Sequence, residues 1–142
     1  MEFRLCQHQN ALMFCPLKAR ALKQSCLAMA RALPKGIVFP SPMVEVHLVR
    51  DGMMAAANQR YMGCLGATNV LSFPGAENLA GVLLLSVDTL LREALLYGQE
   101  PQEHCIRLLA HGMGHLLGYD HGDAMEALCA CMEEAALLVC AG

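Results

Sequence analysis

Three histidines lie close together in the segment His111-Gly-Met-Gly-His115-Leu-Leu-Gly-Tyr-Asp-His121. On a helix, His111 and His115 project from the same face, one turn apart. Gly118 offers the left-handed conformation that ends a helix, so the chain can turn there and bring His121 back toward the first two. Imidazole is a common zinc ligand, and three protein ligands leave a fourth position for water. The spacing therefore predicts a catalytic metal site formed by His111, His115 and His121.

Several alternatives for these histidines stay open. Nitrogen ligation also suits nickel, copper or iron. A closed structural site would use Cys129 or Cys131 as a fourth ligand, because their helix follows His121 closely. Without a metal, the first two histidines would hydrogen-bond to the backbone and the third would be exposed. Asp120 adjoins His121, and it either orients a ligand imidazole or caps the turn.

Gly112 stands where zinc peptidases with the pattern H-E-x-x-H carry their general base. No carboxylate replaces that glutamate between His111 and His115. The sequence therefore argues against a peptidase of that type. The remaining chemistry is that of a zinc-bound water acting as nucleophile while the ion polarises a phosphoryl or carbonyl oxygen.

The elements that position the histidines follow from the sequence pattern. Pro101 predicts the first position of a helix that carries His111 and His115, and its apolar circumference predicts that this helix is central and buried. Strands are expected at Glu2–Gln7, Val44–Val49, Asn69–Phe73 and Gly81–Val87. Further helices are expected at Pro16–Leu33, Asp51–Met62, Asp88–Tyr97 and Asp123–Val139, with Asp51 and Asp123 as caps. The interspersed order predicts one α+β domain over residues 1–142, with a small mixed four-stranded sheet.

Composition supports one domain in the cytoplasm. The 142 residues are 56% apolar, but no apolar run reaches the roughly 18 residues of a membrane span. The first residues lack a basic start followed by an apolar stretch, so we expect no signal peptide. The eight cysteines are therefore expected to be reduced thiols. A net charge of −3 does not indicate a polyanion partner, although a local basic cleft would be invisible in the sum.

The histidine segment resembles the metal motif of the YbeY-type endoribonucleases, the rRNA maturation factors. Two further motifs resemble the same family: Asn58-x-x-Tyr61 followed by the segment Thr68–Pro74, and an apolar strand from Gly81 to Ser86. The three motifs occur in the right order over roughly Val44 to Glu126.

This resemblance implies a zincin-like α+β fold and one Zn²⁺ per chain, held by His111, His115 and His121. It implies endonucleolytic cleavage of single-stranded RNA through a zinc-bound water, with Asp120 as a supporting residue. The family acts in the cytoplasm, in maturation of the 16S rRNA 3′ end and in ribosome quality control. The implied partners are rRNA and the small ribosomal subunit, with no membrane and no DNA.

The chain departs from the family pattern at two motif positions, of which the first faces the cleft in the family. Met62 stands where the family usually has an arginine after the tyrosine, and Val82 stands where it often has aspartate. Arg107 lies one turn before His111 on the same helix face, so it is our candidate for contacting RNA phosphate. The alternative for Arg107 is an ordinary surface arginine.

The predicted strand Asn69–Phe73 supplies two further candidates for substrate binding, Asn69 and Ser72. Because side chains alternate along a strand, Asn69, Leu71 and Phe73 share one face and Ser72 shares the other with Val70. Core packing is the alternative role for Asn69 and Ser72. Tyr61 is either a core aromatic or a platform on which a base stacks.

Other functions remain compatible with the same residues. A ribosome assembly factor would keep the zinc site with weak or no catalysis, as Met62 suggests. Another metal-dependent hydrolase would act on an ester, an amide or a small phosphoester. The charge around the metal distinguishes these readings, because an RNA site needs lysine or arginine there.

Overall fold

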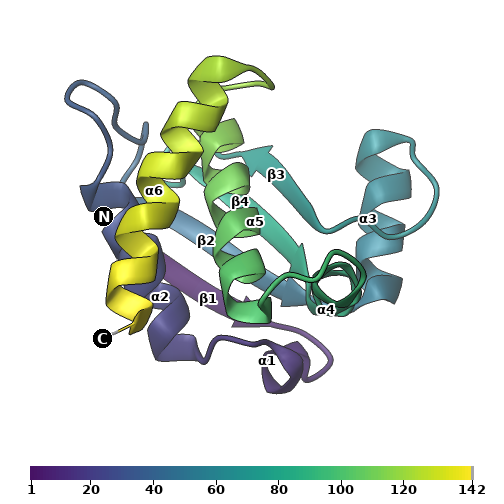
Figure 1. The fold of residues 1–142 in the computed structure, drawn as a ribbon. Coiled ribbons are helices and arrows are strands. Elements are labelled where there is room, and N and C mark those ends of the chain that lie inside the picture. Colours follow the sequence, from purple (N-terminus) through teal and green to yellow (C-terminus); the bar gives the residue numbers. More distant parts are fainter. Residues whose placement is uncertain (142) are drawn as a thin grey trace.

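The computed structural model describes residues 1–141 and contains four strands: β1 (Glu2–Gln7), β2 (Met43–Val49), β3 (Val70–Pro74) and β4 (Gly81–Ser86). They form one sheet in the order β1-β2-β4-β3 (Figure 1). β1, β2 and β4 run parallel, whereas β3 runs antiparallel to β4 and forms an edge of the sheet. The predicted mixed four-stranded sheet is therefore confirmed.

The described residues also form six helices: α1 (Ala11–Phe14), α2 (Ala19–Arg31), α3 (Asp51–Met62), α4 (Val87–Leu96), α5 (Pro101–Leu116) and α6 (Asp123–Ala141). Helices α2, α5 and α6 lie over one face of the sheet (Figure 1). α3 packs at the other side of β3 and β4, in a separate small apolar cluster with Val49, Met54 and Leu71. β3 therefore packs against α5 on one face and against α3 on the other.

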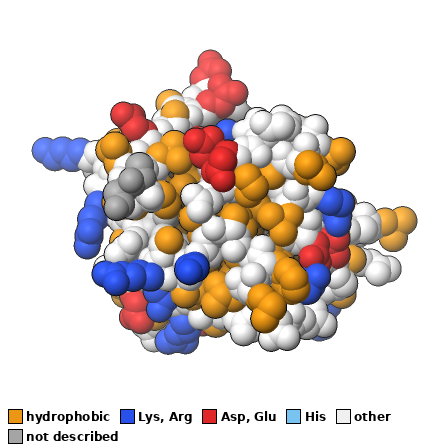
Figure 2. All heavy atoms as spheres, turned by 60° about the horizontal axis from the view of Figure 1, so that its bottom comes forward, with side chains coloured by type: hydrophobic (Ala, Val, Ile, Leu, Met, Phe, Trp, Pro, Cys, Tyr) orange, Lys and Arg blue, Asp and Glu red, His pale blue; other side chains and the backbone are white. Residues whose placement is uncertain are grey.

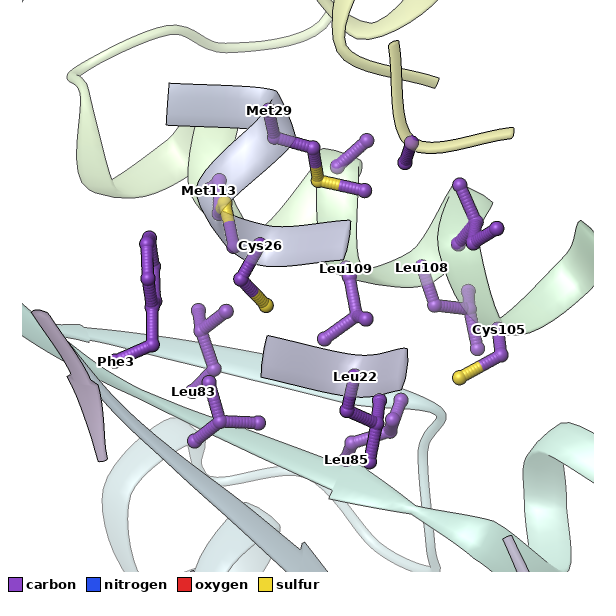
Figure 3. Close-up of a cluster of buried hydrophobic side chains, with 14 of the residues drawn as sticks. Phe3, Leu22, Cys26, Met29, Leu83, Leu85, Cys105, Leu108, Leu109 and Met113 are labelled. Carbon is purple, nitrogen blue, oxygen red and sulfur yellow. The ribbon is translucent and has the colours of Figure 1, made fainter. Parts of the chain in front are cut away.

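The main core lies between the sheet and α2, α5 and α6. The alternate β2 residues Val44, Val46 and Leu48 are at most 2% exposed and belong to this core. Figure 3 shows side chains of α2 and α5 meeting Leu83 and Leu85 of β4. Burying a side chain of this size stabilises the fold by about 1.5–3 kcal/mol. As predicted, α5 is central: nine of its sixteen residues are buried.

The helices in the N-terminal part of the chain differ from the expected ones. The helix predicted from Pro16 begins three residues later, at Ala19, because Lys18 is extended with φ −74° and ψ 162°. The short helix α1 was not predicted. It follows Gln9 and Asn10, which both adopt positive φ, and such single-turn elements leave no periodic pattern in the sequence.

Asp51 does not cap α3 as predicted, because it is the first residue of the helix and Arg50 is the N-cap. Its carboxylate reaches instead to the start of α4. It accepts hydrogen bonds from the hydroxyls of Ser86 (2.8 Å) and Thr89 (2.7 Å) and from the guanidinium of Arg92 (2.7 Å). Burial raises the pKa of Asp51, but these three donors outweigh it and leave the pKa below its usual value.

Asp88 makes the reciprocal contact from α4 to α3. Its carboxylate accepts from the backbone N–H of Asp51 at 2.9 Å and from Nε of Arg50 at 2.8 Å. A carboxylate is favourable at a helix N-terminus, where unpaired N–H groups carry partial positive charge. The N-termini of α3 and α4 are therefore joined by two aspartates, each bound to the opposite helix.

The outer surface is chemically mixed. Figure 2 shows the lower end of the view in Figure 1, where basic, acidic and apolar side chains are interspersed. Within the described residues, no helix is both long and apolar enough to cross a membrane. All eight cysteines are free, as the sequence predicts.

Replacing Asp51 by alanine is expected to lower the free energy of unfolding by about 1–3 kcal/mol, because the buried Ser86 hydroxyl loses its acceptor. Urea unfolding measures this, and Glu126→Ala, at an exposed acid in the first turn of α6, is the control. Because the folded pKa of Asp51 lies below 3.8, its contribution is present above that pH and lost as the pH falls further. Equal stability of Asp51→Ala and Glu126→Ala at neutral pH would contradict the inferred link.

Candidate metal centre

Helix α5 has clear start and stop signals. Pro101 lies in its first turn, and the side chain of the N-cap Glu100 accepts from the backbone N–H of Glu103 at 3.0 Å. At the other end Gly118 has φ +90°, a conformation that favours glycine. The chain reverses at this glycine and returns His121 toward α5, as the sequence predicts.

The structure brings His111, His115 and His121 together. One ligand nitrogen of each lies within 4.8 Å of the others. Nε2 of His111 and Nε2 of His115 are 3.2 Å apart. Tetrahedral zinc with Zn–N bonds of about 2.0–2.1 Å needs ligand nitrogens about 3.3 Å apart. The first two histidines therefore already have nearly the spacing that a shared ion requires.

Hydrogen bonding fixes the protonation of one ligand. Nδ1 of His115 lies 3.0 Å from the carbonyl oxygen of Tyr119. A carbonyl only accepts, so Nδ1 carries the proton and Nε2 keeps its lone pair toward the other histidines. Burial, and then the charges of His115 and His121, lower the pKa of His111. A neutral imidazole is the form that binds a metal, so these residues fit a divalent ion.

The three histidines open into a cleft of about 480 Å³ beside the edge strand β3. This volume lies within the range of about 300–1,000 Å³ that is typical of ligand sites. His111 and His115 are partly buried and His121 is exposed. The other lining residues come from the end of α3, from the chain leading into β3 and from β3 itself: Met62, Thr68, Asn69, Val70, Leu71 and Ser72.

Asn69 and Ser72, the two residues of this segment predicted to bind substrate, both line the cleft, but each side chain already forms hydrogen bonds within the protein. The Ser72 hydroxyl donates to the carbonyl of Gly112 at 2.9 Å, which ties β3 to α5. The Asn69 amide donates to the Glu93 carboxylate at 3.1 Å and accepts from the Val70 N–H at 2.7 Å. These contacts make Asn69 and Ser72 residues that position the strand along the cleft.

The structure places two other predicted residues apart from the cleft lining. Arg107 donates to Gln99 at 2.6 Å and pairs with Glu133 of α6 at 3.5 Å. Asp120 is exposed, and its carboxylate accepts from the backbone N–H of His121 at 2.8 Å. Of the two roles considered for Asp120, the geometry corresponds to the turn cap.

Sequence reasoning missed a buried chain of polar groups behind β3. His104 of α5 is 5% exposed, and its Nε2 lies 3.0 Å from the carboxylate of Glu93, which in turn holds Asn69. His104 is seven residues before His111, so the helical repeat could have indicated a shared face. Nothing in the sequence indicated Glu93, because its two partners, Asn69 and His104, lie 24 and 11 residues away in the chain.

The α-carbon of Gly112 packs against the sheet. A β-carbon at this position would lie 3.0 Å from a Leu83 methyl and 3.2 Å from a Val70 methyl. These distances are shorter than ordinary van der Waals contact, so a glycine allows α5 to approach β3 and β4 closely. The missing peptidase glutamate therefore has a structural reason, since its side chain would meet apolar atoms of the sheet.

The cysteines near the site do not belong to the histidine cluster. Within the described residues, the only group of three or more potential metal ligands is His111, His115 and His121. Sγ of Cys131 donates to the Ala32 carbonyl at 3.1 Å, on the side of α2. The geometry therefore favours a site with three protein ligands over a closed one.

Comparison with known proteins identifies the family to which this chain belongs. The family model described as endoribonuclease YbeY matches residues 8–139, which include all three histidines. This chain belongs to the YbeY family. The endoribonuclease YbeY of Nitratidesulfovibrio vulgaris is 48% identical over 116 residues, covering 66% of this chain and 72% of that protein. The YbeY of Lawsonia intracellularis is 43% identical over 124 residues, covering 87% and 86%.

A solved structure gives the same fold. The solution structure of a Thermotoga maritima protein matches with a TM-score of 0.66 and covers 96% of this chain and 90% of that one. Its sequence identity of 21% makes this a likeness of fold alone. Together with the family match, it confirms the predicted α+β architecture around a central helix that carries the histidines.

We expect purified protein to hold one divalent ion per chain and His115→Ala to hold none. Elemental analysis measures this directly. Zinc at about 100 times its Kd should stabilise the wild type by about 2.7 kcal/mol and leave His115→Ala unchanged. Cys129→Ala is the control and should keep its ion, because Cys129 is outside the cluster. Loss of the ion in Cys129→Ala would instead support the closed site.

Introducing the peptidase residue by Gly112→Glu is expected to destabilise the protein by several kcal/mol, since a carboxylate would enter apolar packing at Val70 and Leu83. Gly52→Glu is the matched control, because Gly52 lies on α3 with no atom within 4 Å of an added β-carbon. Thermal unfolding of both variants measures the difference. Similar melting temperatures would contradict the orientation of Gly112 described above.

Proposed function

We propose that this protein is a zinc-dependent endoribonuclease that cuts single-stranded RNA in the cytoplasm. Its role would be maturation of the 16S rRNA 3′ end and ribosome quality control, with rRNA and the small ribosomal subunit as partners. The observation that carries this proposal is the three-histidine cluster in an open cleft, in a chain of the YbeY family. The relatives described above are named as endoribonucleases.

The chain's own groups have distinct tasks in this proposal. His111, His115 and His121 hold the ion, and the Tyr119 carbonyl keeps His115 in the tautomer that presents Nε2. When bound, zinc supplies an activated water and polarises a phosphoryl oxygen. The open, partly solvated cleft admits a flexible strand, and β3 gives it a rigid wall because Ser72 is bound to Gly112.

A second candidate has its own support. None of the nine residues that line the cleft is lysine or arginine, and Met62 is among them. Proteins that bind nucleic acids usually neutralise phosphates with such side chains. A ribosome assembly factor that keeps its metal but cleaves weakly would fit this composition. Its affinity for the ribosome would then come from other surfaces.

Cleavage of a single-stranded RNA containing the 3′ end of precursor 16S rRNA tests the proposal. We expect zinc-loaded protein to cut it, a chelator to stop the reaction, and added zinc to restore it. His115→Ala should fall to the level of the chelated wild type, because it lacks a ligand, while Cys129→Ala should remain active. Gel analysis of end-labelled RNA measures each rate.

Two results would count against the proposal. Equal cleavage by His115→Ala and wild type would remove the metal from the mechanism. Co-sedimentation with small ribosomal subunits without any metal-dependent cleavage would favour the assembly factor instead.

A further inference from the structure

The lining of the cleft contains none of the basic side chains that commonly bind phosphates. Its lining offers imidazoles, amide and hydroxyl groups, and apolar surface, but no lysine or arginine. The nearest cation by sequence is Arg60, beside the lining residue Met62. A single-stranded nucleic acid has two other features for a protein to recognise, namely the faces and the edges of its bases.

Met62, which lines the cleft, belongs to a group of three large exposed side chains that we call the α3 rim: Tyr61, Met62 and Leu65. Their exposed fractions are 60%, 55% and 89%. Such residues are ordinarily buried or scattered, and three within five positions form an apolar surface next to the Met62 side of the cleft lining. The sequence allowed a core role for Tyr61, but the structure leaves most of its side chain in solvent.

The Tyr61 ring is nevertheless held in place. Phe73 of β3 meets it edge-on, with ring centroids 5.4 Å apart and planes at 69°. The Arg60 guanidinium lies over the ring, 5.3 Å from its centroid. An exposed aromatic that already has such contacts can stack on a base at a smaller conformational cost, because they limit the rotamer freedom that binding would remove.

The edge strand β3 supplies other lining residues of the cleft. The Ser86 N–H donates to the Asn69 carbonyl, and the Gly75 N–H donates to the Ala80 carbonyl. In this hydrogen-bonding pattern the N–H and C=O groups of the odd-numbered residues of β3 bond to β4. Those of Val70 and Ser72 therefore point away from β4, toward the open edge of the sheet. The Val70 N–H is taken by the Asn69 side chain, so two carbonyls and the Ser72 N–H face the cleft side.

We propose that this cleft holds single-stranded RNA by its bases rather than by its phosphates. A base stacks on Tyr61 at the α3 rim, and the edges of neighbouring bases hydrogen-bond to the free backbone groups of Val70 and Ser72. Phosphate contact is limited to the metal position and Arg60. This inference rests on the proposed RNA substrate and specifies how that substrate is recognised.

Binding of a short single-stranded oligoribonucleotide, measured by fluorescence anisotropy in chelator to prevent cleavage, tests the stacking. Tyr61→Ala should weaken binding by about 5- to 150-fold, the loss of one stacked base, and Tyr61→Phe should retain it. Tyr97→Ala is the matched control, because Tyr97 is 63% exposed at the end of α4. Unchanged affinity of Tyr61→Ala would overturn the inference.

Salt dependence and an abasic oligomer of equal length test the limited phosphate contact. The slope of log K against log salt should be no steeper than about −1, as for one phosphate contact, and the abasic strand should bind more weakly than the normal one. A slope of about −3 or steeper, or equal binding of the abasic strand, would overturn the inference. If wild type cuts RNA but fails these tests, only the mode of recognition is wrong. If it neither binds nor cuts RNA, the proposed function fails with it.

Discussion

The close contact between α5 and the edge strand β3 is the constraint on which the rest of the site depends. Gly112 lets the helix approach until a β-carbon would touch Val70 and Leu83, and the Ser72 hydroxyl closes the gap by donating to the Gly112 carbonyl. One face of α5 is thereby committed to the sheet. The histidines, on another part of the helix, are left beside the outer edge of β3, and the cleft forms between them.

Two polar networks keep the other elements around this contact in place. Asp51 and Asp88 join the first turns of α3 and α4, so α3 keeps its position beside β3 and β4. Glu93 links Asn69, at the entrance to β3, with His104 at the start of α5. Polar groups that bind one another across elements distant in sequence favour one arrangement of those elements, because each would lose its partner in any other. The cleft walls are therefore rigid, while the α3 rim is the solvent-exposed part.

The electrostatics of the cleft are unusual for a protein proposed to act on RNA. Three imidazoles that repel one another when charged suit a divalent ion, and the lowered pKa of His111 keeps that ligand neutral. Beyond this, none of the nine lining residues is lysine or arginine, and Met62 adds apolar surface. A metal ion bound by these histidines would therefore supply the main positive charge of the site. Apolar and hydrogen-bonding surface makes up the rest of the cleft.

The sequence by itself determined what depends on local spacing. His111 and His115 at one helical turn, followed by a glycine turn, predicted the histidine cluster, and alternation along β3 predicted which residues share a face. The contacts of Asp51, Glu93 and Arg107 were decided only in the tertiary structure. A helical face is shared by several neighbouring elements, so spacing placed Arg107 near His111 but could not reveal that Gln99 and Glu133 would bind it. The orientation of Gly112 toward the sheet, and the open edge of β3, likewise depend on how elements distant in sequence pack.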